Sequence, residues 1–196
     1  MTMTLIPIFC THEVSPAALS SILSTAYEAS NKIDSPPDLV LLTTSDGDEL
    51  QKYTYNPVTI SPVDFDTSQS PFLGWNLSQI VEFLRESTSN TVVDRSTFLV
   101  ADGQTNSDGD TLLLVHNHTH AIQGPRDLQT VRLSAEYVNS EAIAVSVATK
   151  DVGELSSLVG SDGVFRGGRG SRYGGENGLE VKRGGRASRK KLGGIR

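Results

Sequence analysis

The sequence predicts an α+β, or irregular α/β, fold with helices packed on one mixed or antiparallel sheet and a disordered C-terminal tail. Two observations carry this prediction. Helical and strand patterns alternate along residues 1–165 without the regular spacing of βαβ units. Charge and glycine content then change abruptly near Phe165, which marks the end of the folded part. No internal repeat is visible in the 196 residues.

Strands are predicted where short apolar runs lie between turn-forming residues. The first follows the N-terminus, and the second comes after the Pro36-Pro37 pair. Another apolar run near residue 145 is also predicted to be a strand. The predicted strands span residues 5–10, 38–43, 97–101, 111–116, 130–133 and 143–147.

Helices are predicted where apolar residues recur every three or four positions. Ser15-Pro16 combines a capping residue with proline at the first helical position. Trp75 opens the second helix as a core or helix-entry residue. Residues 45–48 are expected to form a turn, 50–74 a long extended connection and 102–110 a polar hairpin loop. The predicted helices span residues 16 to about 29–32, 76–85, 134–138 and 152–159, with Ser134 and Asp151 as caps of the last two.

The chain separates its charges into two regions. Residues 1–165 contain 7 basic and 21 acidic residues, whereas residues 166–196 contain 10 basic and 2 acidic residues. The second region also holds 10 of the 18 glycines. Too little apolar surface is present there to offset the entropy lost on ordering. We therefore expect an acidic domain over residues 1–167 and a disordered basic tail over residues 168–196.

The Arg/Gly-rich tail predicts contact with single-stranded RNA or another polyanion. Arginine supplies charge and a planar stacking face, tyrosine adds a second stacking surface, and glycine lets the backbone follow an irregular strand. Docking of the tail on the acidic domain, an inert tail or a nuclear import signal are the alternatives. The predicted RNA-binding residues are Arg166, Arg169, Arg172, Tyr173, Lys182, Arg183, Arg186, Arg189, Lys190 and Lys191.

An enzymatic or metal-binding site in the domain is the rival hypothesis. His116, His118 and His120 alternate, so an extended strand would place them on one side, where imidazoles can bind Zn²⁺ or Cu²⁺. The rival places this site near Asp102, His116 and His118, with the tail serving for targeting or self-docking. An exposed polar strand end explains the same histidines without any ligand.

We expect a non-enzymatic protein without a cofactor or resident metal. The chain lacks a Gly-x-Ser-x-Gly elbow and a Walker lysine, and the 102–110 loop lacks the spacing of a calcium loop. Cys10 and His12 form a weak nucleophile–base pair, so Cys10 is better interpreted as a core residue. No membrane span or signal peptide is recognisable. We therefore expect an intracellular protein, cytoplasmic or nuclear, with a further protein partner of unknown kind.

The order of four segments resembles the uncharacterised DUF6924 domain family. The resemblance covers most of residues 5–167, and its distinctive part is the closing hexapeptide Asp162–Gly167. It implies a small α/β domain that Arg166-Gly167 closes, and it supplies no activity. Residues 143–149 and the first helix depart from the family pattern. The matching segments are residues 97–102, 112–115, 131–133 and 162–167.

Overall fold

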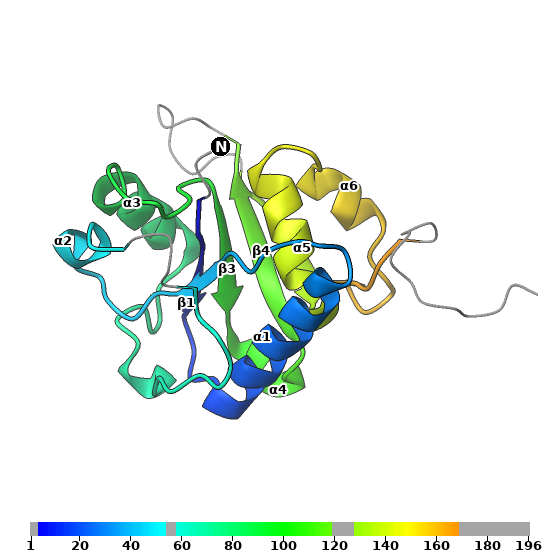
Figure 1. Ribbon diagram of the computed structural model, residues 1–196, viewed down its shortest axis with the longest axis horizontal. Helices are drawn as coiled ribbons and strands as arrows, with labels where there is room; N and C mark the ends of the chain where they lie inside the picture. The colour runs from blue at the N-terminus through cyan, green and yellow to red at the C-terminus, as the bar shows by residue number, and fades with distance from the viewer. Residues whose placement is uncertain (1–3, 54–57, 119–127, 169–196) are drawn as a thin grey trace, which may run out of the picture.

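The computed structural model describes residues 4–53, 58–118 and 128–168, in which a six-stranded sheet lies between helices (Figure 1). The strand order is β2-β1-β3-β4-β5-β6. The strands are β1 (Ile6–Cys10), β2 (Leu39–Leu41), β3 (Thr97–Ala101), β4 (Thr111–Asn117), β5 (Leu128–Ser134) and β6 (Val164–Phe165).

The sheet is mixed, which confirms the predicted fold class. Strands β2, β1 and β3 are parallel, β3, β4 and β5 are antiparallel neighbours, and β6 is parallel to β5. In the β3–β4 pair, Thr97 lies opposite His116 and Val100 lies opposite Leu113. This register fixes which polar residues share an end of the sheet.

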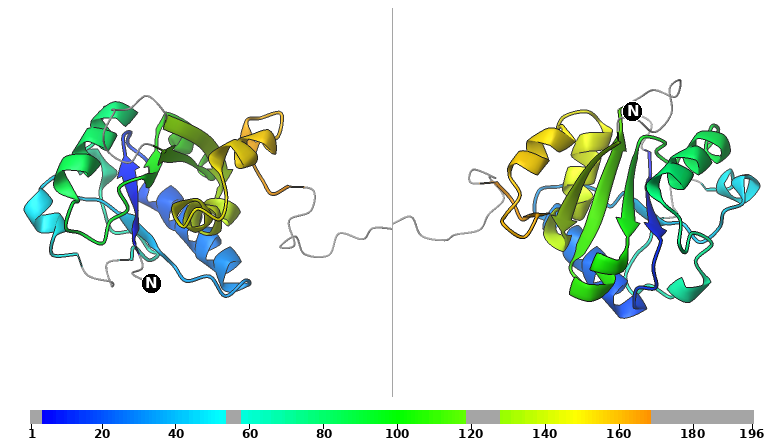
Figure 2. Two further views of the ribbon diagram at one scale, coloured as in Figure 1. Left: turned by 90° about the horizontal axis from the view of Figure 1, so that it is seen from above. Right: turned by 180° about the vertical axis from the view of Figure 1, so that it is seen from behind.

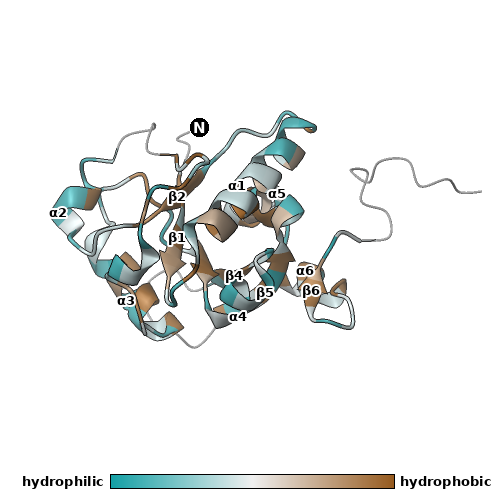
Figure 3. Cartoon of the chain, turned by 90° about the horizontal axis from the view of Figure 1, so that it is seen from below, coloured by the Kyte–Doolittle hydropathy of each residue, from teal (hydrophilic) through white to brown (hydrophobic). Residues whose placement is uncertain are grey.

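Helices cover both faces of the sheet and bury two separate cores (Figure 2). Helices α1 (Pro16–Asn31), α5 (Ala135–Ser146) and α6 (Val152–Ser157) pack on one face. Helices α2 (Gly47–Leu50) and α3 (Leu77–Ser87) cover the other. The strands are largely hydrophobic along their length, whereas exposed helix faces are hydrophilic (Figure 3).

An aromatic cluster forms part of the second core, and Trp75, which is partly buried, packs against it at the entry to α3. The rings of Phe9 and Phe72 meet edge to face at 4.8 Å, and the rings of Phe72 and Trp75 do so at 5.1 Å. Phe83 of α3 contacts all three rings. Edge-to-face pairs add a directional contribution to apolar burial, so this cluster fixes α3 on the sheet.

The predicted strand at residues 143–147 is wrong, because these residues continue helix α5 to Ser146. Their β-branched content suggests a strand locally. Val138, Ala142 and Val145 nevertheless recur at helical spacing, and all three are buried in the core shared with α1. Packing of α5 against α1 therefore overrides the local preference.

Three predicted loops also contain short helices. The expected turn at residues 45–48 leads into α2, which Asp46 caps. The long connection contains a 3₁₀ turn, Thr67–Gln69, and the expected 102–110 loop contains α4 (Gly103–Asp108). Each of these elements depends on an aspartate N-cap, a local hydrogen bond that a search for apolar periodicity does not detect.

The hexapeptide at the end of the domain is anchored in the fold. Val164 and Phe165 form β6, and the rings of Phe165 and Tyr137 meet edge to face at 5.3 Å. Ser134 directly precedes α5, but its hydroxyl donates to the Phe165 carbonyl oxygen instead of capping the helix. Gly167 has φ +87°, and a Cβ there would lie 2.4 Å from the Tyr137 hydroxyl. Only glycine fits this turn.

Candidate functional site

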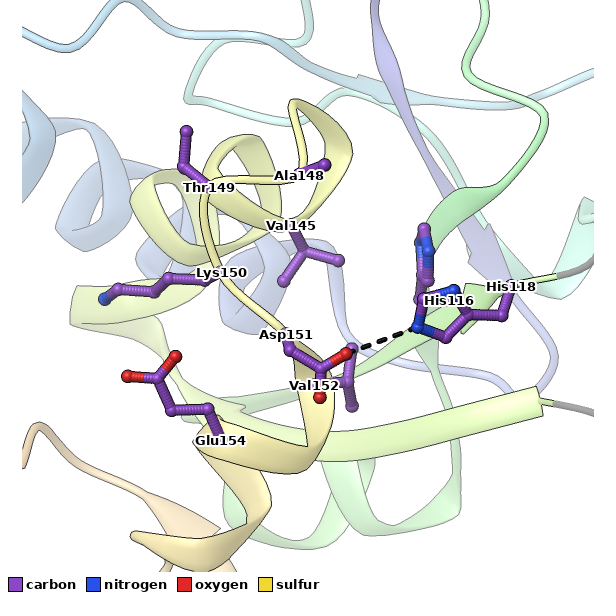
Figure 4. A pocket seen from close by; sticks show the side chains of 9 residues that line it. All are labelled: His116, His118, Val145, Ala148, Thr149, Lys150, Asp151, Val152 and Glu154. Atoms are coloured by element: carbon purple, nitrogen blue, oxygen red, sulfur yellow. Dashed lines mark hydrogen bonds and ion pairs between the residues drawn. The ribbon is translucent and has the colours of Figure 1, made fainter.

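A pocket of about 360 Å³ opens where the end of β4 faces the α5–α6 connection (Figure 4). Strand β4 contributes His116 and His118, whose side chains lie on the same side of the strand as predicted from their alternation. Their rings meet edge to face with centroids 5.0 Å apart. The residues that line the pocket are His116, His118, Val145, Ala148, Thr149, Lys150, Asp151, Val152 and Glu154.

The two imidazoles have different hydrogen-bond partners. His116 Nδ1 lies 2.9 Å from the Thr97 hydroxyl, across the β3–β4 pair. His118 Nε2 lies 3.3 Å from the Asp151 carboxylate, and both side chains are about half exposed. Gln129 is opposite His116 on β5, and its Oε1 is buried without a hydrogen-bond partner among the described residues. This end of the sheet is therefore polar and incompletely paired.

Asp151 links the two sides of the pocket. Its carboxylate accepts from His118 and caps α6 through the Gly153 N–H. The hydrogen bond from His118, followed by that from Gly153, holds the pKa of Asp151 below its usual value. Asp151 therefore remains negatively charged at neutral pH.

Lys150 adds no net positive charge to the pocket, because its ammonium group is paired with Glu141. The two Glu141 oxygens lie 2.8 and 2.6 Å from Lys150 Nζ, and the Glu141 side chain is only 4% exposed. A carboxylate this buried requires a close cationic partner. The charges left in the pocket are those of Asp151 and Glu154.

The position of α5 beside the sheet is fixed by a hydrogen bond at its last residue. Ser146 donates to Asp94 Oδ2, and the other oxygen of Asp94 accepts from the backbone N–H groups of Ser96 and Thr97. The turn before β3 is thus joined to the end of α5. This arrangement holds one wall of the pocket against the strand that carries the histidines.

Asp102 lies at the opposite end of β3, so the rival site of Asp102, His116 and His118 is not formed. Thr97 at the start of β3 is opposite His116, and Asp102 follows the last residue of the strand. About five residues at roughly 3.3 Å each separate the two positions along the strand. Alternation places the histidines together correctly, but the antiparallel register excludes Asp102.

Asp102 is instead part of a structural network. It accepts from the backbone N–H groups of Gln104 and Thr105 and pairs with Arg132 at 2.5 Å. Burial raises the pKa of Asp102, but the hydrogen bonds from Arg132 and Thr105 outweigh this effect and leave the pKa below its usual value. Arg132 also donates to the Thr111 hydroxyl. The sequence offered no signal for Arg132 as the partner of Asp102.

Cys10 is a core residue, as predicted. It is fully buried in the core beneath α1, and burial raises the pKa of its thiol to about 12. The thiol therefore stays protonated at neutral pH and is unsuited to nucleophilic attack. His12, two residues later, is exposed.

The carboxyl end of β1 is crossed by the chain itself. In open sheets with parallel strands, ligands often bind outside the carboxyl ends of the strands. Here the Ser70 hydroxyl donates to the Cys10 carbonyl oxygen, and the Gly74 N–H donates to that of Thr11. These hydrogen bonds hold residues 70–74 across the end of β1. The segment occupies the place where a ligand would bind, so we assign no ligand-binding site there.

Arg166 is the one predicted RNA-binding residue inside the described part of the chain. Its guanidinium lies 3.2 Å from Asp110 and 3.3 Å from Asp162, with about half of the side chain exposed. The other nine predicted residues, from Arg169 to Lys191, lie outside the described residues, as does His120. Within the described ranges, no group of three or more His, Cys, Asp or Glu side chains could hold a metal ion.

No helix in residues 4–53, 58–118 and 128–168 is long and apolar enough to cross a membrane. No curated protein and no solved structure matches the chain. The model of the domain family DUF6924, whose function is unknown, matches residues 41–168, which is well over half of the chain. That range includes β3 to β6, the histidine pocket and the closing hexapeptide. The chain therefore belongs to the DUF6924 family.

Proposed function

We propose that this protein associates with single-stranded RNA or another polyanion through its Arg/Gly-rich tail. The observation that carries the proposal is the charge separation between residues 1–165, with 7 basic and 21 acidic residues, and residues 166–196, with 10 and 2. The acidic domain repels a polyanion, so affinity comes from the tail. The domain would supply contact with a protein partner.

Arg166 is expected to contribute less than the other cations of this set. Both carboxylates beside it, Asp110 and Asp162, compete with phosphate for its guanidinium. The remaining arginines and lysines begin three residues later, beyond Gly168. The proposal therefore assigns RNA contact mainly to residues 169–191.

The test is the salt dependence of binding to a labelled single-stranded RNA oligonucleotide, measured by fluorescence anisotropy. Each phosphate neutralised contributes about −0.7 to the slope of log affinity against log salt. If four to six tail cations engage, the slope is about −3 to −4. Changing Arg169, Arg172, Arg183 and Arg186 to glutamine should reduce both the affinity and the slope.

Two control variants separate stacking from charge and tail from domain. Changing the same four arginines to lysine should keep most of the slope and lower the affinity, because the planar guanidinium is lost and the charge stays. Changing the exposed domain residues Lys32 and Lys52 to glutamine should leave both quantities unchanged. Binding that is insensitive to salt, or whose affinity and slope are unchanged by the glutamine changes in the tail, would refute the proposal.

A further inference from the structure

The histidine pocket carries two carboxylates without a full cationic partner. Lys150 is paired with Glu141, and among the described residues Asp151 accepts only from His118 and backbone N–H groups. Glu154 is exposed and has no ion pair among the described residues. In Figure 4, Asp151 lies between the His118 imidazole and Glu154. The pocket therefore attracts a cation and repels a phosphate or carboxylate.

The remaining walls suit a guanidinium group on an aliphatic stem. Each of the two imidazoles is planar, and because the rings are nearly perpendicular they line the pocket with one ring face and one ring edge. Val145 and Val152 supply an apolar floor. Arginine combines a charged planar fork, which matches a carboxylate, with a stem that packs on apolar side chains. A small, strongly hydrated ammonium group would pair with the carboxylates but would not stack on the imidazoles.

The chain itself supplies arginines within reach. Residue 168 lies beside Leu158 at the end of α6, since a Cβ on Gly168 would be 3.1 Å from a Leu158 methyl group. The pocket lies at the other end of this six-residue helix, about 9 Å away at 1.5 Å per residue. Arg169 and Arg172 follow Gly168 by one and four residues. One extended residue of about 3.3 Å plus the Arg169 side chain, or the four extended residues that lead to Arg172, span the distance.

We propose that the pocket formed by His116, His118, Asp151 and Glu154 binds the guanidinium of Arg169 or Arg172 from the same chain. This contact holds the beginning of the tail on the domain and withdraws those cations from a polyanion. The docking does not require that the tail binds RNA, and only its regulatory consequence rests on the proposed function.

A spin label on the tail tests the docking in the full chain without RNA. Ser171→Cys introduces a labelling site, and the buried thiol of Cys10 does not compete for the reagent. The tether to Gly168 keeps the label near α6 even without docking, so the measured quantity is the part of the broadening of the backbone amide signals of residues 148–154 that high salt removes. In the comparisons below, broadening means this salt-sensitive part. Its absence would overturn the proposal.

Matched variants show whether the carboxylates of the pocket are responsible for the broadening. The double change Asp151→Asn and Glu154→Gln removes both charges, and the asparagine can still cap α6. It should abolish the broadening, as should Arg169→Gln with Arg172→Gln. Glu82→Gln with Glu86→Gln changes two exposed carboxylates on α3, across the sheet, and should leave it unchanged. Equal loss in both acidic variants, or broadening in a mixture of labelled and isotope-enriched chains, would overturn the proposal.

A final comparison distinguishes failure of docking from failure of RNA binding. Releasing the tail with Asp151→Asn and Glu154→Gln should raise RNA affinity by up to about fivefold, the size of an exposed charge-pair effect. Because the broadening is measured without RNA, a chain that docks its tail and binds no RNA would refute the proposed function alone. A chain that binds RNA and shows no broadening would refute the docking alone.

Discussion

The ion pairs at the two ends of β3 and β4 differ in how exposed they are to solvent. At one end, the side chains of Arg132 and Asp102 are 9% and 23% exposed, and both are fixed by additional hydrogen bonds. At the other end, His118 and Asp151 are 53% and 52% exposed beside an open pocket. Removing one partner of a buried, multiply hydrogen-bonded ion pair is costly, because the other charge stays buried, whereas exposed pairs add little stability. The comparison therefore assigns a structural role to the first end and leaves the second available for binding.

The largest expected effect comes from removing the carboxylate at the buried end. Asp102→Ala leaves the Arg132 guanidinium buried without its partner and removes the cap of α4. We expect a loss of about 2–4 kcal/mol in the free energy of unfolding, measured by urea denaturation. Arg132→Met removes the other partner and should cost less, because Asp102 keeps its hydrogen bonds to α4. A loss below about 0.5 kcal/mol for Asp102→Ala would contradict the structural role.

Acid should weaken the same end of the sheet. The pKa of Asp102 is below its usual value in the folded protein, so its stabilising contribution is present above the ordinary carboxyl value of about 3.9. That contribution is lost as the pH falls through the folded value. Between pH 7 and pH 3, Asp102→Asn should therefore lose less stability than the unaltered protein. Urea denaturation at both pH values measures this, with Asp64→Asn, an exposed carboxylate, as the control.

A smaller effect of opposite sign is expected beside the pocket. Ala148 follows α5 with φ 56°, in the left-handed region that favours glycine. Ala148→Gly relieves about 1–2 kcal/mol of this strain, and the added freedom of the unfolded chain offsets part of the gain. We expect a net stabilisation of about 0.5 kcal/mol by thermal denaturation. Destabilisation by the glycine would show that this turn is held by the side chain.

The smallest effect belongs to the exposed ion pair. His118→Ala removes its contact with Asp151, and we expect a change within about 0.5 kcal/mol in the free energy of unfolding at pH 7. His12→Ala, at another exposed histidine, is the matched control. A loss comparable to that of Asp102→Ala would show that the two ends do not differ.

Local patterns predicted most of the strands and helices α1 and α3. Apolar runs placed β1 to β5, the capping signal at Ser15 placed the start of α1, and apolar periodicity placed α3. The local patterns gave a wrong prediction at residues 143–147. Val145 and its neighbours are helical there because α5 packs against α1. The aspartate-capped elements α2, Thr67–Gln69 and α4 were missed because they contain too few apolar residues for a period, unlike α6.

What the sequence by itself determined is therefore local: the strand and helix patterns, the position of His116 and His118 on one side of a strand, and the change of charge after Phe165. What only the tertiary structure decided is which distant residues meet. The antiparallel register separates Asp102 from the histidines, and the return of α5 and α6 across the sheet brings Asp151 to His118 instead. Such contacts depend on the order and direction of strands, which follow from burying both faces of the sheet at once and leave no mark at any single position.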